Sequence, residues 1–89
     1  MRIFELSRGA RRRIVGLPED SARRRYFESR GLVRGAVVEV IFAARYGTAL
    51  RVSGVRLALC RAAALEVEVS DFDAASSVRQ SQFGQEYAV

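Results

Sequence analysis

The sequence predicts a small, mainly β domain: a closed barrel of about five short strands with one inserted α-helix. Three observations lead to this prediction. The chain has 89 residues, of which 49% are apolar, and this is enough for one hydrophobic core but not for two. Apolar and polar residues alternate over much of 36–69, and this period of two is typical of strands. Because the alternating segments are short and joined by local turns, they favour a barrel over an open sheet with exposed edges.

The first strand and the helix are predicted from the residues that bound them. The first strand covers 11–17, and the only proline of the chain ends it. A helix is expected over about 20–30, because Asp20 or Ser21 can cap its first turn. Gly31 then stands where a helix end favours a residue that tolerates the left-handed conformation.

This helix should bury one face against the barrel. Its inward stripe is predicted to consist of Ala22, Tyr26 and Phe27, with Leu32 joining it after the helix ends. A helix that covers a barrel must bury apolar surface, so core packing is the expected role of the two aromatic side chains.

The remaining strands follow from the period of two. We expect a strand over 36–43, a hairpin over 49–60 with Ser53 and Gly54 at its turn, a short turn over 61–64 and a last strand over 65–69. Alternation assigns one set of side chains to one face in each strand. These are Val38, Val40, Phe42, Leu50, Val52, Val55, Leu57, Leu59, Leu65, Val67 and Val69.

The composition changes after the last predicted strand. Residues 1–70 are expected to form the barrel domain, and 71–89 to form a polar, mobile tail without an apolar period. A few isolated apolar residues of the tail could dock on the barrel or on a second copy of the chain, which leaves a homo-oligomer open. They are Phe72, Phe83, Tyr87 and Val89.

The absence of histidine restricts the chemistry more than any other feature. Without histidine the chain has no Ser-His or Cys-His relay, and with a single cysteine, Cys60, it cannot form a closed structural zinc site. Neither a phosphate-binding glycine loop nor a nucleophile elbow occurs in the sequence. We therefore expect a protein that is not an enzyme and has no cofactor.

The localisation is predicted from what the chain lacks. No apolar stretch approaches the ~20 residues of a membrane span, and the first residues do not resemble a secretory signal. The chain is expected to be cytoplasmic, without direct insertion into a membrane.

The basic residues, all arginine, are unevenly distributed. Residues 1–18 contain five arginines and one glutamate, whereas along 19–30 much of the arginine cluster has carboxylates within helical reach. The expected i,i+4 pairs are Glu19 with Arg23, Asp20 with Arg24, and Arg24 with Glu28. The N-terminal excess could attract phosphate, but it lacks the interleaved aromatic residues that stack on bases. Specific nucleic-acid binding is not expected.

Three carboxylates form the best candidate for a metal site. Glu66 and Glu68 are two residues apart on the last predicted strand, about 7 Å by strand rise, and Glu39 could share the outer surface. Carboxylates can hold Fe²⁺ or Mn²⁺, but without histidine they would form a weak site at best. We interpret them as the outward polar positions of strands, and assign no metal ligand.

The order of motifs resembles that of the FeoA domain, the small SH3-like barrel associated with bacterial ferrous-iron uptake. The resemblance covers 6–69 and rests on LSRGARRRIVGL, then RRRYFESRGLVRGAVVEV, then GTALRVSGVRLALCRAAALEVEV. Its sharpest parts are Gly31, Leu32 and Gly35, together with Leu57, Ala58 and Leu59. The chain departs from the family pattern at Arg30, where leucine is usual, and at Tyr26 and Phe27, where aliphatic residues are common.

The resemblance implies a non-enzymatic accessory module that docks on the cytoplasmic G-protein part of the ferrous-iron transporter FeoB. If the helix and its glycine corner form the docking edge, the expected contact residues are Tyr26, Phe27 and Leu32, with Arg24 as a charge at the rim. Two alternatives stay open: a nucleic-acid-binding barrel that uses the N-terminal arginines, and a metal-sensing module.

Overall fold

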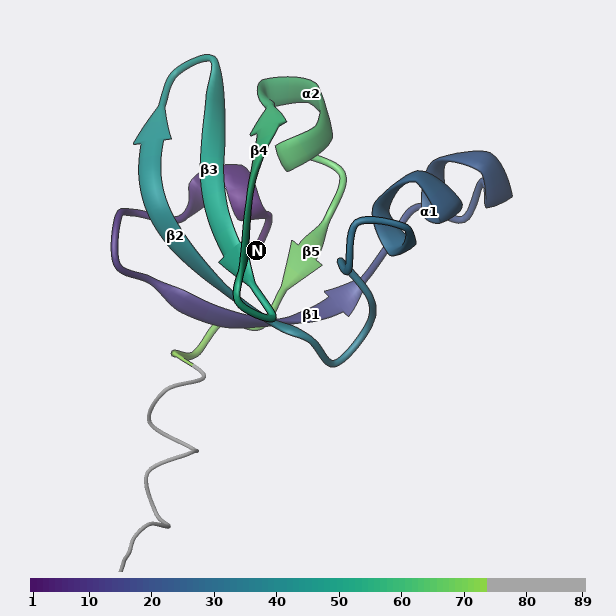
Figure 1. The fold of residues 1–89 in the computed structure, drawn as a ribbon, viewed down its shortest axis with the longest axis horizontal. Coiled ribbons are helices and arrows are strands. Elements are labelled where there is room, and N and C mark those ends of the chain that lie inside the picture. The colour runs from purple at the N-terminus through teal and green to yellow at the C-terminus, as the bar shows by residue number, and fades with distance from the viewer. Residues whose placement is uncertain (74–89) are drawn as a thin grey trace, which may run out of the picture.

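A single curved sheet of five antiparallel strands dominates the computed structural model, which describes residues 1–73 (Figure 1). The strands are β1 (Arg11–Gly16), β2 (Val37–Ala44), β3 (Gly47–Val52), β4 (Val55–Cys60) and β5 (Glu68–Val69). Three helical segments accompany them: η1 (Ile3–Glu5), α1 (Ser21–Glu28) and α2 (Arg61–Ala64). The predicted class, a mainly β domain of about five strands with one inserted α-helix, is confirmed. Of the predicted tail, 71–89, the part from 74 onward lies outside the described residues.

The strand order is β4-β3-β2-β1-β5, so most neighbours in the sheet are also neighbours in the chain. The β3–β4 hairpin turns at Ser53 and Gly54 as predicted, with Val52 paired to Val55 and a positive φ of 51° at Ser53. β1 is central to the fold, because it pairs with β2 on one side and with β5 on the other.

The barrel is not closed by a continuous ladder, because β4 and β5 are the two ends of the strand order. The segment between them, 61–64, was predicted to be a turn, but it forms the single helical turn α2. Its Ala63 and Ala64 are buried in the core, and side chains this small let the helix pack closely against the sheet. Helix packing, rather than strand pairing, fills the gap between the two end strands.

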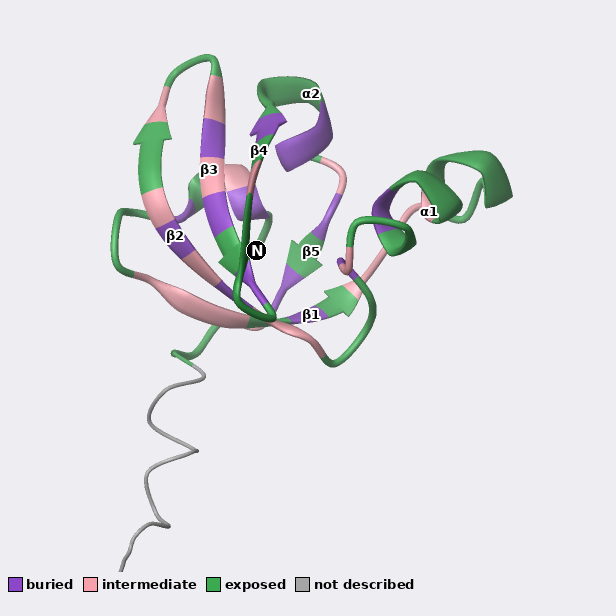
Figure 2. Ribbon diagram, in the orientation of Figure 1, coloured by how far each residue is buried: buried purple, intermediate pink, exposed green. Residues whose placement is uncertain are grey.

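The core lies inside the curve of the sheet and draws on every element (Figure 2). Its largest fully buried side chains include Phe27 from α1, Ile3 from η1 and Ile14 from β1. Leu32, just after α1, is buried as well. The inward positions Val38, Val40, Leu50, Val52, Leu59, Val67 and Val69 are buried as predicted.

Three predicted inward residues lie outside the core. Phe42 is 55% exposed because a bulge between Val40 and Phe42 shifts the register of β2 against β3 and ends the simple alternation. Val55 is 59% exposed at the hairpin tip on the end strand, beyond the reach of the core. Leu65 is exposed because it ends α2 rather than starting β5.

Helix α1 projects from the side of the barrel opposite the β2–β3 hairpin (Figure 1). Ala22 and Tyr26, which were predicted to face inward, are exposed, and Phe27 alone anchors the helix in the core. A helix of eight residues that projects in this way can bury only the part of its stripe that meets the sheet. Among the described residues, none of the helices has the length and apolar character needed to cross a membrane.

Candidate docking surface

Helix α1 projects from the barrel and is bounded by a hydrogen-bonded turn at each end. Asp20 caps its first turn, since its carboxylate accepts a hydrogen bond from the backbone N–H of Arg23 at 2.9 Å. At the other end Gly31 adopts a φ of +86°, and the backbone N–H of Leu32 donates to the carbonyl of Phe27 at 3.0 Å. The predicted cap at Asp20 is confirmed, whereas the helix ends at Glu28, two residues earlier than predicted, with Ser29 as its C-cap and the left-handed turn at Gly31. The buried ring of Phe27 and side chain of Leu32 then fix the helix on the barrel.

Tyr26 lies on the exposed side of the helix between two arginines. Its ring meets that of Phe27 edge to face, with centroids 5.1 Å apart. The guanidinium carbon of Arg30 lies 3.8 Å from the centre of the Tyr26 ring, and that of Arg23 lies 5.6 Å from it. The arginine side chains and the buried Phe27 therefore restrict the orientation of an aromatic ring that is still 36% exposed.

Arg23 also ties the helix to the segment that precedes β5. Its Nε donates to a carboxylate oxygen of Glu66 at 3.1 Å, and its Nη2 donates to the same oxygen. The hydrogen bond and the charge of Glu66 raise the pKa of Arg23 above its usual value. Because the pair is largely exposed, its role is to orient the two side chains rather than to stabilise the fold.

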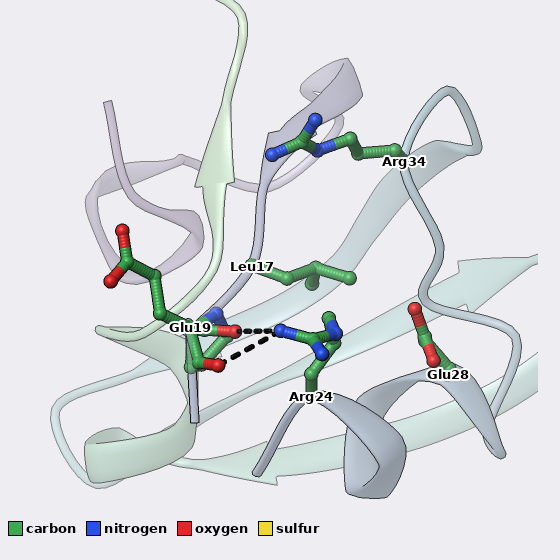
Figure 3. A pocket seen from close by; sticks show the side chains of 6 residues that line it. Leu17, Glu19, Arg24, Glu28 and Arg34 are labelled. Atoms are coloured by element: carbon green, nitrogen blue, oxygen red, sulfur yellow. Dashed lines mark hydrogen bonds between the residues drawn. The ribbon is translucent and has the colours of Figure 1, made fainter. Parts of the chain in front are cut away.

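Arg24 lies on another side of α1, over a hollow of about 330 Å³ (Figure 3). Its Nη1 donates to the carbonyl of Glu19 at 2.9 Å and to that of Pro18 at 3.4 Å. Glu28 from the same helix and Arg34 from the following loop also line the hollow. The residues that line the hollow include both carboxylates and arginines, and none of these charged side chains is buried.

None of the three expected i,i+4 ion pairs occurs within residues 1–73. Asp20 is engaged as the helix cap, Arg23 reaches Glu66 on another segment, and Arg24 donates to backbone carbonyls. Sequence spacing alone could not reveal these competing partners.

The four residues predicted as partner contacts separate into two groups. Arg24 and Tyr26 are accessible, whereas Phe27 and Leu32 are 0% exposed. Phe27 and Leu32 can therefore position a docking surface but cannot touch a partner unless the barrel opens. We define the α1 surface as Arg23, Tyr26 and Arg30; Arg24, two residues before Tyr26, points to another side of the helix. Arg23 and Arg30 were not predicted, although their spacing of three and four residues from Tyr26 is the usual signal for neighbours on one helix face.

The three carboxylates considered as a metal site have other surroundings. Glu39 lies 3.2 Å from Nη1 of Arg51 and 3.6 Å from Nη1 of Arg11, and Glu66 binds Arg23. Glu68 lies on β5 opposite Gly16. In the part of the chain that the structure describes, no three acidic or cysteine side chains gather in a way that could hold a metal ion.

The N-terminal arginines do not form one phosphate-binding stripe. Arg11 faces Glu39, while Nη1 of Arg12 donates to the carbonyl of Ser70 at 3.1 Å. Nη1 of Arg13 donates to the carbonyl of Gly35 at 2.7 Å. These three side chains reach three different parts of the fold, so their charges are dispersed.

The fold and its surface together define a small SH3-like domain that presents a fixed aromatic and arginine-rich helix. A model of the FeoA domain matches residues 1–71. The chain belongs to the FeoA family, and this membership implies involvement in ferrous iron transport.

Solved structures of FeoA proteins have the same fold. An iron uptake regulatory protein (FeoA) is similar with a TM-score of 0.74 and 27% identity, covering 78% of this chain and 93% of the other. A FeoA-like protein from Clostridium acetobutylicum has a TM-score of 0.71 and 25% identity, covering 79% and 84%. The FeoA protein from Chlorobium tepidum has a TM-score of 0.68 and 31% identity, covering 78% and 68%. No curated protein matches the chain.

Proposed function

We propose that this chain is a cytoplasmic, non-enzymatic accessory module of ferrous iron uptake, which docks through its α1 surface on the cytoplasmic G-protein part of a FeoB-type transporter. The observation that carries the proposal is the match to the FeoA domain over 1–71, in a chain whose most prominent projecting element is α1. The sequence contains no histidine and no nucleotide-binding loop, so docking is a more suitable role for it than catalysis.

The α1 surface has the composition of an interface centre. Tyrosine and arginine are over-represented among the residues that dominate binding energies. Here the Tyr26 ring is already held by Arg30 and Phe27, so little conformational freedom would be lost on binding. The partner surface that fits is a shallow apolar pocket for the tyrosine ring, bordered by carboxylates for the arginines.

The test is titration calorimetry of the full chain against the purified cytoplasmic domain of the transporter. Tyr26→Ala should weaken binding about tenfold or more, and Arg24→Gln should weaken it less, because Arg24 points to another side of α1 than Tyr26. Phe72→Ala is the matched control, since Phe72 is an exposed aromatic residue away from α1. Equal affinity of the Tyr26→Ala and wild-type chains, with both folded by circular dichroism, would refute docking through α1.

A further inference from the structure

A second surface, on the outer side of β2, β3 and β4, is not used by the proposed docking through α1. It is an apolar groove of about 260 Å³. The exposed rings of Phe42 and Tyr46 form its walls, and Ala49, Ala58 and Cys60 are among the residues that line it. Figure 1 places this part of the sheet on the side of the barrel away from α1.

The strand register explains why the groove is open and apolar. Phe42 pairs with Ala49, and Ala49 pairs with Ala58, so an aromatic ring stands beside two methyl groups across three strands. In the next row on the same face, Gly47 pairs with Cys60. The bulge before Phe42 turns this ring outward. Small side chains beside an exposed ring leave space that another chain can fill.

The groove adjoins the free edge of the sheet. β4 pairs with β3 and ends the strand order, and α2 packs beside its C-terminal end (Figure 1). The part of the β4 edge that α2 leaves open offers main-chain groups to an added strand, within the part of the chain described here. An extended peptide that pairs with β4 would place alternate side chains beside Ala58 and Cys60, from where a long apolar side chain can extend across the small residues of β4 and β3 toward Phe42 on β2. The β4 edge can therefore bind the main chain of an extended partner, and the groove can bind its side chains.

Charge specifies the chemistry of that partner. Between Glu39 and Glu66 the chain contains no acidic residue, and it carries Arg45, Arg51, Arg56 and Arg61. Arg51 pairs with Arg56 in the row beside Ala49 and Ala58, on the same face of the sheet. Arg51 is engaged by Glu39, and the guanidinium of Arg61 lies 5.3 Å from the centre of the Phe4 ring. A second copy of this surface would bring arginine against arginine, whereas carboxylates on the incoming strand would be attracted.

We propose that the β4 edge and its groove bind an extended acidic segment of a partner protein, in which apolar side chains alternate with carboxylates. The apolar side chains enter the groove beside Phe42, and the carboxylates meet the arginines at its rim. This site is separate from the α1 surface, so each can be tested without the other.

Cys60 supplies the test, because it is exposed in the groove and is the only cysteine of the chain. The rate at which a maleimide labels Cys60 in the full chain is measured with and without a synthetic peptide that alternates valine and phenylalanine with glutamate. A saturating amount of this peptide should slow labelling about tenfold. A peptide with arginine in place of each glutamate, and one interrupted by proline, should give no protection.

Two variants show where the peptide binds. Ala58→Arg fills the groove from an exposed position and should abolish protection, whereas Tyr26→Ala, on the α1 surface, should leave it unchanged. Equal protection by the basic peptide, or protection that persists in Ala58→Arg, would overturn the proposal. The proposal would also be overturned if Cys60 already reacted slowly in the chain alone. A slow labelling rate that does not depend on protein concentration would indicate that the chain's own C-terminal segment occupies the groove. A labelling rate that falls as protein concentration rises would indicate that a second copy occupies it.

Discussion

The guanidinium of Arg30 lies 3.8 Å from the centre of the Tyr26 ring, one helical turn away, and its Nη1 also donates to the carbonyl of Tyr26 at 2.8 Å. Arg30 thus contacts both the ring and the main chain of one residue. This arrangement makes Arg30 the main support of the exposed aromatic side chain on α1.

Arg30→Ala should lower the free energy of unfolding by about 0.5 to 1 kcal/mol, the usual contribution of an exposed cation–π contact. Arg30→Lys should lower the free energy of unfolding by less than Arg30→Ala does, because the positive charge over the ring is retained. Urea unfolding is measured for both Arg30 variants, for Tyr26→Leu and for the combined substitutions. The double-mutant cycle then gives the coupling free energy between Arg30 and Tyr26. A coupling energy of zero would mean that the stacked arrangement does not stabilise the helix.

Phe27→Ala should cost about 3 to 5 kcal/mol, because it removes a fully buried ring from the core. Tyr26→Ala, at the neighbouring position, should cost under about 1.5 kcal/mol, because its ring is partly exposed and its main contacts are on the surface. Denaturant melts of the two variants compare these costs directly. Similar losses would indicate that Tyr26 is also part of the core.

The main features of α1 could be predicted from the sequence, but the role of its two aromatic residues could not. Capping by Asp20 and the left-handed turn at Gly31 depend on local chemistry, which is contained in a few adjacent residues. Whether Tyr26 or Phe27 faces the barrel depends on where a short helix crosses the sheet, and no local signal determines this. The ion pair of Arg23 with Glu66 joins residues far apart in the chain, so helical spacing predicted the wrong partner.

The contrast between local signals and dependence on distant residues also explains which features of the sheet could be predicted and why the groove could not. Alternation predicted the buried residues Leu50, Val52 and Leu59, because each strand is long enough to show its period. The bulge that exposes Phe42 inserts a single residue and leaves no clear signal in an apolar segment. The groove could not be predicted, because it depends on that bulge and on the register of three strands.

Gly47→Ala tests how closely β3 and β4 approach each other. A Cβ added at Gly47 would lie 2.5 Å from the carbonyl oxygen of Leu59, a main-chain atom that cannot move aside without disturbing the ladder. We expect a loss of about 1 to 3 kcal/mol in the free energy of unfolding, as for other substitutions that overpack a site. Gly16→Ala is the control, because its nearest neighbour would be the Glu68 side chain at 3.3 Å. A Gly47→Ala chain as stable as wild type would show that the strands separate more easily than the structure indicates.

The N-terminal arginines provide the test of the nucleic-acid alternative. Because Arg11, Arg12 and Arg13 reach Glu39, Ser70 and Gly35 respectively, few of their charges are directed at one strand of phosphates. Fluorescence anisotropy of the full chain with a labelled single strand and a labelled duplex should therefore detect only weak binding that does not depend on base sequence. The logarithm of affinity should fall with the logarithm of salt by about 0.7 to 0.9 for each phosphate neutralised. Replacing the three arginines by glutamine should remove this binding and leave binding to the transporter domain intact. Submicromolar, sequence-selective binding at physiological salt would instead make nucleic acid the functional partner, because nonspecific phosphate contacts cannot produce selectivity among sequences.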